Sequence, residues 1–239
     1  MWDNPRLLNA SANLLLGVAL ALLALAGTQL LLRSPWLELR EVTVLGAPTH
    51  TGGEQIRRAT QAALAGANFL AVDIDAVRGA LEQLPWVRRV ELRRVWPDRL
   101  EISLEEHVAF AHWGDAGLVN THGEFFAARS DESLPHLAGP QGTVAEVTRR
   151  YRAFAQLLAP LADAPLRVTL TSRYAWQLRL ASGLHIELGR DYPAEPADRR
   201  LARFVAAYPQ TLARVQRKHE YVDLRYSNGF ALRIPELDG

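Results

Sequence analysis

The feature that most constrains this chain is an apolar run from Leu14 to Leu32, in which Thr28 and Gln29 are the only polar side chains and no charge occurs. About 19 residues at a helical rise of roughly 1.5 Å span about 28 Å, close to the roughly 30 Å hydrocarbon core of a bilayer. A helix satisfies its own backbone hydrogen bonds, as a single segment in lipid must. The run therefore predicts a transmembrane helix over residues 14–32 that anchors the protein in a lipid bilayer.

Two other interpretations of this run remain open. A cleaved signal peptide is one, because Ala24–Ala26 followed by Gly27 resembles the small-residue cleavage pattern. The apolar run continues past that point through Leu30–Leu32, which favours a retained anchor. A buried globular helix is the other, but such a helix is usually apolar on one stripe rather than on all faces.

The segments that flank the run say little about its orientation. Residues 1–13 are too short to fold alone, so we expect a disordered stub there. Arg6 and the amino terminus precede the run, whereas Arg33 and Arg40 follow it. The positive-inside rule does not fix the orientation from this balance, because large domains are translocated largely regardless of their charge.

Composition limits the chemistry that the rest of the chain can perform. Among the 239 residues, 27 basic and 26 acidic side chains give a formal net charge of +1, so nucleic acid is not an expected partner. The chain has no cysteine, which excludes disulfides, thiolate nucleophiles and cysteine metal sites. The part after the anchor is long enough for two small domains with cores of their own.

The first of these domains is expected within residues 33–106 and has the order β-α-α-β-β. A strand over residues 39–45 ends at Gly46, and a helix that ends at Gly66 follows a capping box of Thr51 and Glu54. Asp73 is typical of the N-cap of a second helix, which Pro85 ends.

The remaining two strands of this domain form a hairpin whose register the sequence predicts. With Trp96–Asp98 as the loop, the apolar positions 90 and 92 face positions 104 and 102 on one side of the ladder. The other side then pairs Arg93 with Glu101 and Arg89 with Glu105. Opposite charges directly across strands contribute roughly 0.2–1 kcal/mol each, so a single register satisfies both faces.

Residues 107–239 predict a second α+β domain, an antiparallel meander with flanking helices. Turn residues at 114–117, 121–123 and 182–183 separate its strands, and residues 130–142 are rich in proline and glycine and predict a loop. The expected strands are 110–113, 118–120, 167–171, 176–180, 184–188, 221–226 and 230–234, and the expected helices lie at 144–161 and 201–208.

No catalytic or metal-binding constellation is visible, so the sequence predicts a protein without cofactor or enzymatic activity. The seven histidines give neither HExxH nor a helical i, i+4 pair. Lys218, the only lysine, has Val215 where Ser-x-x-Lys needs serine, and neither GxSxG nor a P-loop occurs. Glu101 and Glu105 face arginines on a strand, which indicates a solvated polar face rather than a carboxylate pair.

Several of these segments together resemble one known family. The PWV at residues 85–87, the WPDRL at 96–100 and the EEH at 105–107 resemble the POTRA domain of the FtsQ/DivIB family of bacterial division proteins. The RLARF at 200–204 and the YVDLRYSNG at 221–229 are similar to the C-terminal β-domain of that family. The resemblance implies a POTRA domain over residues 33–106 and a β-domain over 107–239. It also implies a single-pass protein of the bacterial inner membrane at the division site, with a cytoplasmic stub and a periplasmic bulk.

The terminal hairpin is the expected binding surface, because nothing later in the sequence covers its last strand and an open strand edge can accept a partner strand. The resemblance implies that FtsB, itself paired with FtsL, adds a strand there. It implies the anchor residues Arg173, Tyr221, Arg225, Tyr226, Gly229 and Phe230. This chain departs from the family pattern at Ile234, where some members have a tryptophan. Separately, the POTRA domain is expected to bind other division proteins.

A non-catalytic divisome scaffold that supports septum assembly is thus the predicted function. Two alternatives belong to other classes. One is a POTRA-containing envelope assembly or chaperone-like protein, although the tail is too short and too helical for a barrel. The other is a membrane-anchored periplasmic hydrolase, for which the sequence shows no catalytic motif.

Overall fold

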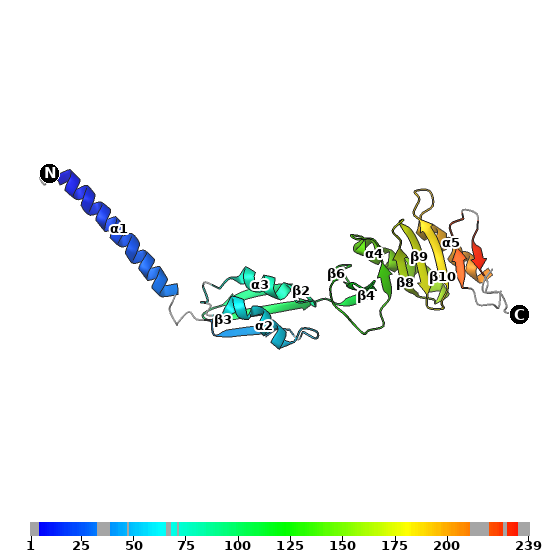
Figure 1. The fold of residues 1–239 in the computed structure, drawn as a ribbon, viewed down its shortest axis with the longest axis horizontal. Helices are drawn as coiled ribbons and strands as arrows, with labels where there is room; N and C mark the ends of the chain where they lie inside the picture. The colour runs from blue at the N-terminus through cyan, green and yellow to red at the C-terminus, as the bar shows by residue number, and fades with distance from the viewer. Residues whose placement is uncertain are drawn as a thin grey trace. The chain divides into compact units, whose positions relative to one another are not determined.

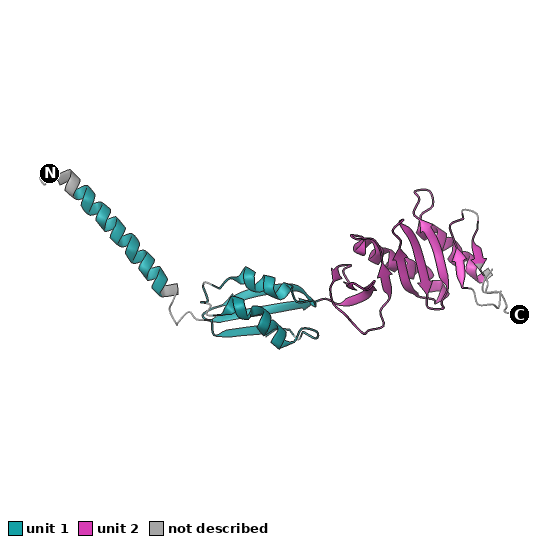
Figure 2. Cartoon of the chain, in the orientation of Figure 1, with its two compact units in different colours: residues 1–106 teal, residues 107–239 magenta. Residues whose placement is uncertain are grey.

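The computed structural model describes residues 5–32, 39–46, 48–65, 68–70, 72–210, 220–226 and 229–233 (Figure 1). The chain divides into two compact units, Met1–Glu106 and His107–Gly239 (Figure 2). Each unit has a hydrophobic core of its own.

A long apolar helix, α1 (Pro5–Leu32), opens the first unit. Its segment Asn9–Leu30 covers 22 residues with a mean hydropathy of 2.0, and none of it is buried against the rest of the chain. The helix begins nine residues before the apolar run, so the stub that we expected to be disordered is helical from Pro5 on. Proline is tolerated in a first helical turn, where its missing N–H has no intrahelical acceptor.

The remainder of the first unit has the predicted β-α-α-β-β order. Its elements are β1 (Glu41–Leu45), α2 (Gly53–Leu64), α3 (Ile74–Glu82), β2 (Val87–Val95) and β3 (Arg99–Glu106). The central strand β3 pairs in parallel with β1 and antiparallel with β2. Helices α2 and α3 pack against one another. The core of this unit consists of the buried residues Ile56, Val72, Val77, Leu81, Val87, Val90, Leu100 and Ile102.

The predicted hairpin register is confirmed. Positions 90 and 92 lie opposite 104 and 102, and Arg93 and Arg89 lie opposite Glu101 and Glu105. A bulge inserts Arg88 into β2, and it is Arg88 whose Nη1 forms an ion pair with Glu105 Oε1 at 2.6 Å.

The two helix starts behave differently. Asp73 is the N-cap of α3, as predicted, and its Oδ1 accepts from the N–H groups of Asp75 and Ala76 at 3.0 Å. The capping box at Thr51 is wrong, because the N-cap of α2 is Gly52 and makes no side-chain cap bond.

Thr51 instead belongs to a loop that the last residue of β3 holds in place. The Glu106 carboxylate accepts from the N–H groups of Thr49 at 2.8 Å, His50 at 3.2 Å and Thr51 at 2.7 Å. The His50 ring stacks on Trp86, with centroids 3.7 Å apart. Burial raises the pKa of Glu106, but hydrogen bonds from Thr51, Thr49 and His50 outweigh it and lower the pKa to about 2.

The second unit is a nine-stranded sheet with helices, which confirms the α+β class. The strand order is β12-β11-β10-β9-β8-β7-β4-β5-β6. The strands are β4 (Ala109–Trp113), β5 (Gly117–Asn120), β6 (Phe125–Phe126), β7 (His136–Ala138), β8 (Pro165–Leu170), β9 (Ala175–Leu180), β10 (His185–Arg190), β11 (Tyr221–Asp223) and β12 (Ala231–Arg233). The helices are α4 (Val144–Leu158) and α5 (Ala197–Ala207), each followed by a 3-10 turn, η2 (Ala159–Leu161) and η3 (Tyr208–Gln210).

The sheet is mixed, so the prediction of a purely antiparallel meander is wrong at three junctions. Strand β7 pairs in parallel with β4 and with β8, and β10 pairs in parallel with β11. The segment between β7 and β8 contains α4, and that between β10 and β11 contains α5. A helical crossover of this kind returns the chain to the same end of the sheet and so gives parallel neighbours. Strand β7 also lies within the segment predicted as a loop.

One face of this sheet carries the core and the other is polar. Helix α4 packs on β7 and β8, α5 packs on β10, and the two helices contact one another. The strands and both helices contribute buried residues to this core: Leu137, Phe154, Leu158, Val168, Leu170, Trp176, Leu178, Leu180, Ile186, Leu188, Leu201, Phe204, Val222 and Leu224. The residues that alternate with these along each strand face away from the helices.

Candidate partner-binding surface at the end of the sheet

The last strands are joined to the sheet through β10. In the β10–β11 ladder Tyr221 lies beside His185, and the N–H of Leu224 donates to the carbonyl of Glu187 at 2.9 Å. Strand β12 pairs antiparallel with β11 and is the outermost strand of the described sheet. Its outer edge therefore has backbone N–H and C=O groups that no described strand pairs with.

Arg225 follows β11 and is fixed by a buried carboxylate. Its Nη2 donates to Oδ2 of Asp223 at 2.6 Å, and its Nε donates to Oδ1 of the same side chain at 2.9 Å. Asp223 is 5% exposed. The hydrogen bond from Arg225 lowers the pKa of Asp223, and the same pairing raises the pKa of Arg225. Both groups thus stay charged, and the guanidinium keeps one orientation.

Gly189 on β10 makes room for this arginine. Its φ of +73° lies in the left-handed region, and a Cβ there would lie 2.8 Å from Cγ of Arg225. A glycine is therefore needed at this position both for the backbone and for the close approach of the side chain.

A groove of about 550 Å³ brings three of the predicted site residues together. Arg173 reaches it from the turn between β8 and β9, and Tyr221 and Arg225 reach it from the end of the sheet. The Tyr221 ring stacks on His185, with centroids 5.4 Å apart, and burial together with the charge of Asp223 raises the pKa of Tyr221. The groove is further lined by Thr171, Ser172, Ala175, Gln177, Glu187, Gly189, Arg190 and Tyr192.

The other predicted residues lie outside this groove. The Tyr226 side chain is 57% exposed, and its carbonyl accepts from Nη2 of Arg203 at 3.2 Å. Phe230 packs edge-on against Phe204 in the core, with centroids 5.7 Å apart. Gly229 has open space where a Cβ would stand. Ser227, Asn228 and Ile234 lie outside the described residues.

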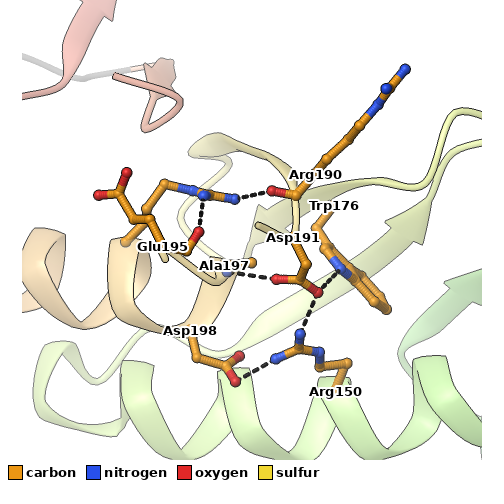
Figure 3. Close-up of polar contacts among 8 residues, drawn as sticks. Arg150, Trp176, Arg190, Asp191, Glu195, Ala197 and Asp198 are labelled. Carbon is orange, nitrogen blue, oxygen red and sulfur yellow. Dashed lines mark hydrogen bonds and ion pairs between the residues drawn. The ribbon is translucent and has the colours of Figure 1, made fainter. Parts of the chain in front are cut away.

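Sequence reasoning missed a polar network that joins α4, α5 and the end of β10 (Figure 3). Arg150 on α4 forms ion pairs with Asp191, which follows β10, and with Asp198 on α5. Asp191 also accepts from Nε1 of Trp176 at 3.1 Å and from the N–H of Ala197 at 2.7 Å. Burial raises the pKa of Asp191, but these hydrogen bonds and the charge of Arg150 lower it below its usual range.

A second arginine closes the loop between β10 and α5. Arg200 is 2% exposed, and its guanidinium donates to the carbonyls of Arg190 and Glu195. On the outer side of α5, Arg203 links the Glu195 carboxylate at 2.7 Å to the carbonyl of Tyr226. The loop and the terminal strands are therefore held by the same helix.

Within the described ranges, no group of three or more histidine, aspartate or glutamate side chains is placed to hold a metal ion. The stacked pair of His112 and His136, with centroids 4.8 Å apart, has no third ligand of this kind.

One helix long and apolar enough to cross a membrane, a β-α-α-β-β unit and a sheet domain whose last described strand has an open edge fit a single-pass membrane protein with a two-domain extramembrane part. Residues 37–107 match the POTRA domain, FtsQ-type, and residues 111–225 match the C-terminal family of cell division protein FtsQ/DivIB.

Full-length relatives agree with these matches. Cell division protein FtsQ of Burkholderia pseudomallei is 42% identical over 236 residues, which cover 98% of this chain and 94% of the relative. FtsQ of Nitrosospira multiformis is 38% identical over 240 residues (98% and 99%), and FtsQ of Escherichia coli is 34% identical over 204 residues (82% and 72%). The chain therefore belongs to the FtsQ/DivIB family, and it is a single-pass inner-membrane protein of bacterial cell division.

Proposed function

We propose that this protein is a non-catalytic scaffold of the divisome that binds FtsB and FtsL through its terminal strands and so supports septum assembly. The stub is cytoplasmic and the two folded units are periplasmic. The catalytic alternative has no support in the described residues, whereas strand addition has a specific surface to use.

The open edge of β12 is the observation that carries this proposal. A strand of a partner can continue the hydrogen-bond ladder there, because the inner edge of β12 is already paired with β11. Backbone pairing alone gives little specificity, which side chains next to the edge must supply.

Those side chains favour an acidic partner with an aromatic contact. Arg173, Arg190 and Arg225 line the groove beside the terminal strands, and among the described residues that line it Glu187 alone is acidic. Because Asp223 fixes Arg225, little side-chain entropy is lost when a partner carboxylate binds the guanidinium. The exposed ring of Tyr226 can be buried by the same partner, as aromatic hot spots are.

A binding isotherm between residues 40–239 and the periplasmic FtsB–FtsL segment tests the proposal. None of the described α1 side chains is buried, and of the described residues that pack against either core the fragment lacks Leu39 alone. We expect saturable binding that Tyr226→Ala weakens by more than ~2 kcal/mol. Phe125→Ala is the matched control, since Phe125 is an exposed aromatic residue on β6, at the opposite end of the sheet. Equal affinity of the Tyr226 and Phe125 variants would exclude the terminal strand from the interface.

Thiol labelling tests the proposed orientation. Because the chain has no cysteine, single substitutions Asp3→Cys and Glu132→Cys give unambiguous signals. In intact spheroplasts, a membrane-impermeant maleimide should label the Glu132 variant alone. Labelling of the Asp3 variant alone would reverse the orientation.

We further propose that the POTRA unit binds other division proteins through a surface of its own. Strand β1 lies at an edge of its sheet, and a groove of about 620 Å³ between β1 and α2 is lined by the exposed Val42 and the partly buried Val44. Val42→Asp should reduce recruitment of the protein to the septum and leave the FtsB–FtsL isotherm unchanged. Normal recruitment of this variant would remove β1 from consideration.

A further inference from the structure

A row of basic side chains crosses five adjacent strands of the large sheet. In register, His112 on β4 lies beside His136 on β7, which lies beside Arg167 on β8. Arg167 lies beside Arg179 on β9, and Arg179 lies beside His185 on β10. We call these five residues the basic row.

The basic row lies on the face of the sheet that the helices leave open. The chain neighbours Leu137, Val168, Leu178 and Ile186 are buried in the core beneath α4 and α5. Since side chains alternate along a strand, the row points the other way. Three of its members, His136, Arg167 and Arg179, are exposed, and the other two are partly exposed.

This arrangement carries an electrostatic cost in the folded protein. Like charges directly across strands are destabilising, and neither the Arg167 nor the Arg179 guanidinium has a hydrogen bond or ion pair with a described residue. Partial desolvation by the neighbouring side chains, and then the charges of His112 and Arg167, lower the pKa of His136, and the charge of Asp115 opposes them. At the other end of the row, Oε2 of Glu187 lies 4.0 Å from Nε2 of His185.

We propose that the basic row is a docking site for an acidic α-helix of a partner protein, whose axis runs across the strands. The site is separate from the edge of β12, and the proposal does not depend on strand addition there. The guanidinium groups of Arg167 and Arg179 form the centre of the site, where partner carboxylates supply the counter-charges that the described residues do not.

The spacing of the strands favours a helix over an extended segment. Neighbouring strands lie about 4.8 Å apart, so the five positions span about 19 Å. Carboxylates at every third or fourth helical residue repeat at about 5 Å and cover about 21 Å in four steps, which keeps them opposite the row. In an extended peptide, residues on one face repeat at about 6.7 Å, and four steps exceed the row by more than one strand spacing.

Titration with a synthetic helix tests this proposal. The probe is a fluorescent 18-residue peptide of alanine and glutamine with glutamate at every third or fourth position, and a peptide of the same composition with scrambled glutamates is its control. At low salt, residues 40–239 should bind the striped peptide at least tenfold more tightly than the scrambled one. The Arg167→Gln/Arg179→Gln double variant should lose at least tenfold in affinity for the striped peptide.

Controls separate this site from loss of fold and from the terminal strand. Arg129→Gln/Arg149→Gln removes two exposed arginines outside the row and should bind within twofold of the unaltered protein, as should Tyr226→Ala. The double variant in the row should melt at an equal or higher temperature, because a like-charge contact is gone. Equal binding of both peptides, or no binding of either, would overturn the proposal. If anionic vesicles or polyglucuronate bound more tightly than the striped peptide, and the double variant lost that binding, the proposal would also be overturned. The ligand of the row would then be a lipid surface or a polysaccharide.

Discussion

The carboxylate of Glu106 is expected to hold the first unit together more than any exposed ion pair in it. Lowering its pKa from 4.5 to about 2 corresponds to about 3.4 kcal/mol of preference for the charged form in the folded state. The side chain is 12% exposed, so solvent screens part of this energy. We expect Glu106→Gln, which keeps the shape but removes the charge and one acceptor oxygen, to lower the free energy of unfolding by about 2–3 kcal/mol.

The effect depends on pH in a defined direction. As pH falls, the unfolded chain protonates this carboxyl near pH 4.5, whereas the folded protein does so only near pH 2. The stabilisation is therefore complete above about pH 4.5 and is lost as pH falls from there to about 2. The unaltered protein should lose more stability over this interval than the Glu106→Gln variant does.

Urea unfolding of residues 40–239 at pH 7 and at pH 3.5 measures both effects, and amide exchange at Thr49, His50 and Thr51 reports the loop directly. Glu105→Gln is the control, because Glu105 is the preceding residue and its side chain is 47% exposed in its ion pair with Arg88. Such a pair contributes at most about 1 kcal/mol. If both variants lost the same stability, the hydrogen bonds from the loop would not be the cause and the reasoning would fail.

Three further substitutions act in the second unit. Gly189→Ala should lower the free energy of unfolding by about 1–2 kcal/mol, through strain at positive φ and contact with Arg225, and should weaken FtsB–FtsL binding in the same isotherm. Phe230→Ala should cost about 2 kcal/mol in urea unfolding because it removes an edge-on contact with Phe204, so a loss of binding without a loss of stability would contradict its place in the core. Arg150→Met should cost about 2 kcal/mol, since it leaves two carboxylates without their partner, and an unchanged unfolding midpoint would show that the network adds nothing.

The parts of the fold that follow from short-range pattern could be predicted from the sequence. In the hairpin of β2 and β3, alternating apolar residues and facing charges leave a single register, and the structure has it. Asp73 was recognisable because a cap acts on the N–H groups two and three residues later. Thr51 matched the same kind of pattern, but a carboxylate 55 residues away holds its N–H.

The features of the fold that the sequence did not predict depend on contacts between segments far apart in the chain. Strand β7 is three residues long and lies in a segment rich in proline and glycine, so its place between β4 and β8 comes from its neighbours alone. The parallel pairs depend on where α4 and α5 return the chain. Arg150 contacts partners 41 and 48 residues away, a separation at which no local pattern exists.

In the candidate site, too, some residues lie where short-range pattern predicts and others are placed by long-range contacts. Tyr221 and Arg225, predicted as anchors, line one groove, while the residues that alternate with them, Val222 and Leu224, are buried in the core. Strand β11 ends at Asp223, and the predicted anchor Tyr226 lies beyond it with an exposed side chain. Phe230 lies in a hairpin read as a binding surface, and only the position of Phe204 on α5 shows that it belongs to the core.

Because β11 pairs with β10, the proposed binding surface forms only after the last segment of the chain has been synthesised and has paired with the sheet. Strand β10 is complete at Arg190, but its free edge stays open until Tyr221–Asp223 have been added. A chain cut short between these points would lack the binding strand and would also expose a strand edge next to the buried Ile186 and Leu188, which invites aggregation. A partner that docks at β12 would therefore select full-length, fully paired molecules.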